Sequence, residues 1–128
     1  MPLVRFHYQL EVYRDAFDLA IILYGHTKAW PATEQYALSS QIVRSSRSIC
    51  SNIAEIWGRR DYTKSFRAKI VDALSEAYET ITWLEFAEAL ALLSAQERAS
   101  YTHRYHGVAA RLHNMRENAS SWCFDGNR

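Results

Sequence analysis

Helix breakers and turn formers are scarce in this sequence, which has only four glycines and two prolines in 128 residues. Both prolines, Pro2 and Pro31, precede long uninterrupted stretches. A β-rich fold needs many turns, and turns depend on these residue types. Their scarcity favours long helices. The length fits one domain over residues 1–128, because shorter pieces would bury too small a core.

Cysteines and long apolar runs are scarce as well. Cys50 and Cys123 are the only cysteines, and they stand far apart without the spacing of a metal site. No apolar run reaches the ~20 residues of a membrane span. Met1 to Tyr8 also lacks the apolar segment of a signal peptide. We therefore expect a cytoplasmic protein with reduced thiols and no membrane partner.

Neither sign of charge dominates, since the formal net charge is +1. The charges are nevertheless unevenly placed along the chain. Residues 42–70 hold seven Lys and Arg against two acidic residues, whereas residues 71–97 hold six acidic residues and no Lys or Arg. Two interpretations stay open: a binding patch, or two solvated faces of opposite sign that help to pack neighbouring molecules.

The apolar periodicity predicts four helices, over residues 10–29, 33–57, 62–92 and 95–119, followed by a frayed tail over residues 120–128. Trp122 and Phe124 in this tail are candidates to dock on the helices. The connections span only a few residues, which forces consecutive helices to run antiparallel. The fold class is therefore all-α, an antiparallel up-down-up-down four-helix bundle.

Local signals place the ends of these helices. Pro31 should end the first, because the residue before a proline avoids the α region. Thr33 and Asp61 are the expected N-caps of the second and third helices. Ser94, followed three residues later by Glu97, is a capping box that should open the fourth helix.

Apolar positions define the inner faces of the helices and leave a surplus. In the second and fourth helices they alternate at spacings of four and three residues, as in coiled coils: Leu38, Ile42, Ser45, Ile49, Asn52 and Ile56, then Tyr101, Tyr105, Val108, Leu112, Met115, Ala119 and Trp122. The first helix carries two apolar stripes, one with Leu10, Tyr13, Phe17, Ala20 and Tyr24 and one with Val12, Ala16, Leu19 and Leu23. The third carries Val71, Leu74, Tyr78, Trp83 and Phe86 outside its inner line. A single bundle leaves such stripes uncovered, which predicts a homo-oligomer.

A polar stripe follows one side of the second helix. Arg44, Ser48, Asn52 and Glu55 recur there at helical spacing, and a buried Asn needs a hydrogen-bond partner. Acidic residues on the third helix are candidates to face this stripe, namely Glu76 and Glu79. We favour a structural polar network of Ser48, Asn52, Glu55, Glu76 and Glu79 that fixes the helix register over a ligand site.

Six basic residues are candidates for nucleic-acid contact: Arg44, Arg47, Arg59, Arg60, Lys64 and Arg67. Four of them surround the turn between the second and third helices, with Trp57 and Tyr62 interleaved. Guanidinium groups and aromatic rings serve backbone contact and base stacking. The alternative is an ordinary basic turn on a protein surface.

Signals for catalysis or metal binding are weak. His103, His106 and His113 can share one side of the fourth helix, but the Glu-x-x-His motif of di-iron bundles is missing. We interpret these histidines as surface residues, with a shared site across subunits left open. Cys50 lies one turn from Arg47, which would lower the pKa of its thiol, but no paired His is evident. We therefore predict no catalytic residue, cofactor, metal or small-molecule substrate.

The central residues resemble a known family. Arg44, Ser48-Ile49, the run Ser51-Asn52-Ile53-Ala54-Glu55 and Gly58-Arg59 are similar to the signature of the four-helix bundle proteins encoded by intervening sequences in bacterial 23S ribosomal RNA genes. The segments Trp30-Pro31-x-x-Glu34-x-Tyr36 and Glu76-x-x-Glu79-Thr80-x-x-Trp83 also fit, so the resemblance covers residues 6–117. One position departs from the pattern, because relatives usually have glycine where this chain has Ile56.

The resemblance implies a homopentamer. It also implies similarity to the accessory protein of diversity-generating retroelements, a pentameric bundle that works with a reverse transcriptase and binds RNA. No biochemical activity comes with the intervening-sequence family. Our leading hypothesis is a non-enzymatic, oligomeric RNA-binding or scaffold protein. The alternatives are a protein-interaction module that uses its apolar helix faces and, last, a metal-dependent enzyme.

Overall fold

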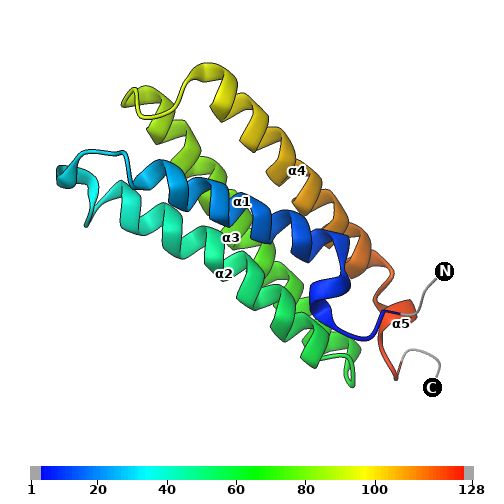
Figure 1. The fold of residues 1–128 in the computed structure, drawn as a ribbon. Helices are drawn as coiled ribbons and strands as arrows, with labels where there is room; N and C mark the ends of the chain where they lie inside the picture. The colour runs from blue at the N-terminus through cyan, green and yellow to red at the C-terminus, as the bar shows by residue number, and fades with distance from the viewer. Residues whose placement is uncertain (1–3, 126–128) are drawn as a thin grey trace.

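The computed structural model describes residues 4–125, and this part of the chain contains helices and no strand. The four long helices are α1 (Glu11–Thr27), α2 (Leu38–Gly58), α3 (Thr63–Ala89) and α4 (Ala95–Glu117), with a short α5 (Ala119–Trp122) and two 3-10 turns, η1 (His7–Gln9) and η2 (Ala32–Glu34). Consecutive helices run antiparallel, and α4 returns to pack beside α1 (Figure 1). The predicted all-α four-helix bundle is confirmed.

The bundle core contains the residues that the heptad spacing placed inside. The six predicted positions of α2 are all buried, including the polar Ser45 and Asn52 and the bulky Ile56. On α4 the side chains from Tyr105 to Met115 at these positions are buried, whereas Tyr101 is only partly covered. Ile56 is fully buried, so its bulk lies inside the bundle and not at a surface.

Two of the three predicted N-caps are wrong. After Pro31 the chain forms the η2 turn, so Thr33 lies outside α2, which begins at Leu38 with Ala37 as its N-cap. The N-cap of α3 is Tyr62 and not Asp61. A 3-10 turn and a long-range contact replace these caps, and neither has a local sequence signal.

The capping box of α4 is confirmed. The Glu97 amide donates to Ser94 Oγ at 3.0 Å, and the Ser94 amide donates to Glu97 Oε1 at 2.9 Å. These bonds lower the pKa of the Glu97 carboxyl, because they favour its charged form. The sequence alone defines this helix start, since both partners lie within one turn.

The segment after α4 is ordered over most of the predicted tail. Ala119–Trp122 form α5, Cys123 is buried, and the Trp122 ring packs edge-on against Trp57 with centroids 6.1 Å apart. The prediction of a frayed tail is therefore wrong up to Asp125, and residues 126–128 lie outside the described part. Within residues 4–125, no helix is long and apolar enough to cross a membrane.

Candidate nucleic-acid interface at the α2–α3 turn

The structure divides the six basic candidates into two groups. Arg44 and Arg47 lie near the middle of α2, whereas Arg59, Arg60, Lys64 and Arg67 surround its end and the start of α3. At about 1.5 Å per residue, Arg44 and Arg59 are roughly 22 Å apart along the helix axis. The six residues therefore do not form one continuous patch.

Arg44 and Arg47 already have partners within the chain. Arg44 forms ion pairs with Glu76, at 3.4 Å, and with Glu79, both on α3. The guanidinium of Arg47 lies over the ring of Tyr24 on α1, 5.4 Å from its centroid. Both side chains thus join α2 to a neighbouring helix, which makes them weaker candidates for RNA contact.

Arg60 is held between two aromatic rings. Its guanidinium lies 3.6 Å from the centroid of Trp57 and 4.9 Å from that of Phe124, and its Nε donates to the Trp57 carbonyl at 2.8 Å. Burial lowers the pKa of Arg60, although an arginine remains a cation at any physiological pH. Arg60 therefore anchors a stack of cation and rings at the surface of the turn.

The other three residues of this group are exposed cations. Lys64 and Arg67 project from the first two turns of α3, and Arg59 donates to Ser65 Oγ at 3.1 Å. Within residues 4–125 no carboxylate pairs with any of the three at salt-bridge distance. The first turn of α3 contains no acidic residue, and the carboxylate of Asp125 accepts hydrogen bonds from the Thr63 amide at this positive helix end.

Arg5 joins this group from a distant part of the sequence. The Trp57 Nε1 donates to the Arg5 carbonyl at 3.0 Å, and the Arg5 side chain is exposed. Figure 1 shows η1 and α5 at the same end of the bundle as the α2–α3 turn. We call Arg5, Arg59, Arg60, Lys64 and Arg67 the basic turn. Arg5 was missed because no local pattern connects it with residues more than 50 positions away.

The predicted polar network has different partners from those expected. Asn52 Nδ2 donates to the carbonyl and the Oγ of Ser48, at 2.9 and 3.2 Å, within its own helix. Glu55 forms an ion pair with Lys69 at 2.9 Å, which lowers the pKa of Glu55 and raises that of Lys69. Glu76 and Glu79 face Arg44 instead, so the five residues do not form one network.

A buried pair of hydroxyls joins α2 to α3. Thr80 Oγ1 donates to Ser45 Oγ at 2.8 Å, and both side chains are fully buried. Ser45 is a polar member of the heptad pattern, and Thr80 lies on the inner face of α3. The contact contributes to the helix register, which is the role that the sequence suggested for Asn52.

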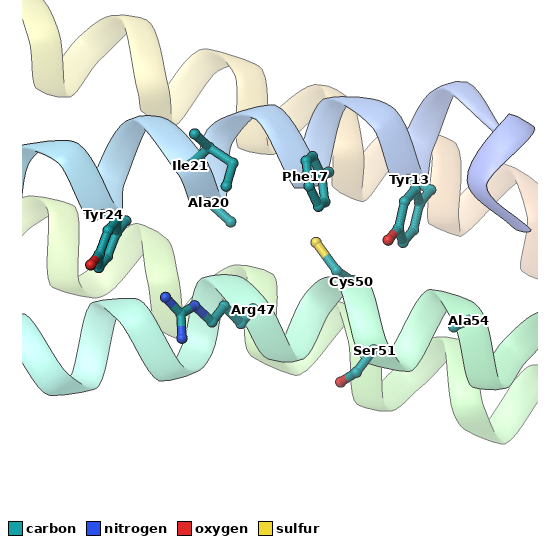
Figure 2. Close-up of a pocket in the computed structure, with 9 residues that line it drawn as sticks. All are labelled: Tyr13, Phe17, Ala20, Ile21, Tyr24, Arg47, Cys50, Ser51 and Ala54. Carbon is teal, nitrogen blue, oxygen red and sulfur yellow. The ribbon is translucent and has the colours of Figure 1, made fainter.

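An apolar groove runs between α1 and α2 (Figure 2). It is lined by Tyr13, Phe17, Ala20, Ile21 and Tyr24 from α1 and by Arg47, Cys50, Ser51 and Ala54 from α2. Phe17 is 47% exposed and Tyr24 40% exposed, so part of the α1 stripe that contains them is uncovered in the single chain, and the neighbouring Ile21 is exposed as well. Aromatic and aliphatic side chains thus line an open groove on the surface of the single chain.

The groove does not activate its cysteine. Burial raises the pKa of the Cys50 thiol to about 11, and its Sγ points toward the Ser46 carbonyl. The expected lowering by Arg47 is wrong, because the guanidinium lies on Tyr24. A neutral thiol is a poor nucleophile and a poor metal ligand.

The histidines of α4 lie on the surface. His103, His106 and His113 are exposed, and His113 Nε2 forms a hydrogen bond of 3.0 Å with the Tyr78 hydroxyl. No group of three or more His, Cys, Asp or Glu residues within residues 4–125 is arranged to hold a metal ion.

These features define an all-α bundle protein with a basic end and an uncovered apolar groove between α1 and α2. Residues 8–114 match the family of the 23S rRNA-intervening sequence protein, and the chain belongs to this family. The match covers the four long helices up to the last turn of α4. It confirms the family that the central motif of α2 indicated.

A solved structure supports the same fold. It is a protein of unknown function from the S23 ribosomal protein family of Bacteroides thetaiotaomicron, with a TM-score of 0.72 and 24% sequence identity. The similarity covers 83% of this chain and 98% of that one. At this identity the likeness concerns the fold alone. A search of curated proteins found no match to the chain.

Proposed function

We propose that the protein is a non-enzymatic, homo-oligomeric RNA-binding protein of the cytoplasm that contacts RNA through the basic turn. The observation that carries this proposal is the set of exposed cations beside an aromatic ring at one end of the bundle. Arg59, Lys64 and Arg67 offer charge to phosphates, and the stack of Arg60 on Trp57 lies beside them, with the Phe124 ring on the guanidinium.

Assembly would strengthen such contacts. One basic turn contains few cations, and binding to phosphates grows with the number of charges engaged. The uncovered stripe of α1 supports a homo-oligomer, and the resemblance to pentameric bundles suggests five subunits. In a ring every subunit would present its basic turn on the same face, so weak contacts would add through avidity.

The RNA hypothesis is tested by filter binding of a structured RNA over a range of salt concentrations. Affinity should fall steeply with salt, since each phosphate contact releases counterions. The double variant Arg59→Glu, Lys64→Glu should weaken binding about tenfold or more and flatten the salt dependence. Absence of measurable binding at low salt would refute the proposal.

A matched control is available at the opposite end of the bundle. Lys28 is an exposed cation after the last turn of α1, so Lys28→Glu changes the net charge by the same amount per site. We expect this variant to bind RNA nearly as well as the unmodified protein. Equal losses of binding free energy per reversed charge in the two variants would indicate binding by overall charge, with no role for the basic turn.

The apolar groove favours a second candidate function, that of a protein-interaction module. Phe17, Ile21 and Tyr24 offer an aromatic and aliphatic surface of the kind that covers a partner helix. A protein that co-purifies in fixed proportion and resists nuclease treatment would support this candidate. Such a partner should be lost on replacement of Ile21 by Asp, whereas the basic turn would be unaffected.

A further inference from the structure

The end of the described chain closes over the basic turn. Cys123 is buried and anchors the segment after α5. The Phe124 amide then donates to the Arg60 carbonyl at 2.8 Å, and the Phe124 ring covers the Arg60 guanidinium. One residue further on, the Asp125 carboxylate accepts hydrogen bonds from the Thr63 amide, at 3.1 and 3.2 Å, and from its hydroxyl, at 2.5 Å.

These two side chains have the chemistry of a nucleotide. A flat ring lies on a guanidinium that also contacts Trp57, as an unpaired base does in single-stranded RNA complexes. An anion accepts bonds from the first amide of α3, where phosphates bind at helix N-termini. Lys64 and Arg67 on the same turns of α3 increase the positive potential around that anion.

The ring of the closing segment is lightly packed. Phe124 is 60% exposed, so little apolar area is buried by its contact with Arg60. The bonds of Asp125 to Thr63 are charge-assisted and partly buried, so they stabilise the closed state. Because Cys123 remains anchored, residues 124 and 125 can leave the turn without unfolding α5.

From this arrangement we propose that Phe124 and Asp125 are a built-in competitor that occupies the RNA-binding surface of the basic turn, the ring in place of a base and the carboxylate in place of a phosphate. The proposal rests on the proposed RNA-binding function. In the closed state, RNA meets only Arg5, Arg59, Lys64 and Arg67. Opening adds the Arg60 face and the N-terminus of α3, and the apparent affinity is reduced by the fraction of molecules that is closed.

The test is fluorescence anisotropy with a short labelled oligouridylate, which offers unpaired bases. The variant Phe124→Ala, Asp125→Ala should bind about tenfold more tightly than the unmodified protein, because it no longer closes the turn. Asp61→Asn is the matched control. This change removes an exposed carboxylate from the same turn, and that carboxylate does not take part in closing the turn. We expect the affinity to rise about twofold from the change in charge alone.

A second measurement uses the unmodified protein and does not depend on variant stability. Addition of oligouridylate should accelerate hydrogen exchange of the Phe124 amide, which bonds to the Arg60 carbonyl in the closed state. Circular dichroism of the double variant checks that α3 keeps its helix after loss of the Asp125 cap.

The outcomes separate the two proposals. In one outcome the unmodified protein binds oligouridylate, the affinity of the double variant rises no more than that of Asp61→Asn, and hydrogen exchange of the Phe124 amide is unchanged. The competitor is then refuted and the RNA-binding function stands. If the double variant alone binds, the competitor is supported. If neither binds at low salt, the RNA-binding function fails and the competitor fails with it.

Discussion

Burial controls the chemistry of the polar side chains inside the bundle. Cys50 lies between α1 and α2 with its thiol neutral, since burial raises its pKa to about 11. The Tyr105 hydroxyl is fully enclosed by the four helices, and burial raises its pKa as well. Neither group ionises near neutral pH. The arginine and lysine side chains of the basic turn, by contrast, lie at or near the surface.

Cys50 should therefore be alkylated slowly in the folded protein. At pH 8 its thiolate fraction is about a hundredfold lower than that of a thiol with the ordinary pKa of 9.0. The rate of reaction with iodoacetamide, followed by peptide mass spectrometry, should rise with pH up to about 11. The raised pKa also predicts that native stability falls above pH 9, because the unfolded thiol ionises first.

Unfolding supplies the control for this experiment. In concentrated urea, Cys50 should react at the rate of a free thiol. Equal rates in native buffer and in urea at pH 8 would show that the thiol is not shielded by Tyr13, Phe17 and their neighbours in the groove.

Both ends of α3 differ from those of an ordinary helix. Its N-terminus is capped by Asp125 from the other end of the chain. At its C-terminus, the Leu92 amide bonds to the Ala87 carbonyl at 2.8 Å and the Ala91 amide to the Glu88 carbonyl at 3.0 Å. This is a Schellman motif, and it places Ala91 at a φ of 59°, in the left-handed region that glycine favours.

Replacing Ala91 by Gly should stabilise the protein. The left-handed conformation strains a residue with a Cβ atom, and removing that strain outweighs the added freedom of the unfolded chain. We expect a gain of about 0.5–1 kcal/mol in the free energy of urea unfolding. Ala110→Gly, at an exposed site within α4, is the control and should cost about 1 kcal/mol. A loss of stability in both variants would contradict backbone strain at Ala91.

The elements that follow from local chemistry were predictable. The heptad positions of α2 and the capping box at Ser94 depend on residues within a few turns of one another, and both are confirmed. The starts of α2 and α3 were not predictable, because a 3-10 turn displaces Thr33 and a residue 62 positions away caps Thr63. The order of the tail was not predictable for the same reason, since its partners are Trp57 in the last turn of α2 and Arg60 in the turn that follows.

The candidate site shows the same limit. Four of its cations lie close together in the sequence, namely Arg59, Arg60, Lys64 and Arg67. The clustering of charge therefore predicted them. The partners that decide their availability are distant: Glu76 and Glu79 engage Arg44, and Phe124 covers Arg60. Charge and aromatic content thus indicate where a binding surface lies. Tertiary contacts determine which of its residues are free to bind.

For the whole molecule, one open apolar surface is the groove between α1 and α2. Aromatic and aliphatic side chains line it, and exposed stripes of this kind usually mark an interface. A second apolar surface lies between the start of α2 and the end of α3, where Phe86 and Leu90 are each about half exposed. Two apolar surfaces on one chain suit a ring, in which each subunit contacts two neighbours.

Light scattering should therefore give a mass of several subunits, five times 14.9 kDa if the pentamer holds. Phe17→Asp should shift the mass toward that of one subunit, because burying an unpaired carboxylate at an interface costs several kcal/mol. His106→Asp, on the polar exposed face of α4, should leave the assembly intact, and both variants should keep the helical circular dichroism of the bundle. A monomer at micromolar concentration would contradict the assembly. A Phe17→Asp protein that stays assembled would instead place the interface away from α1 and leave the groove free for a different partner.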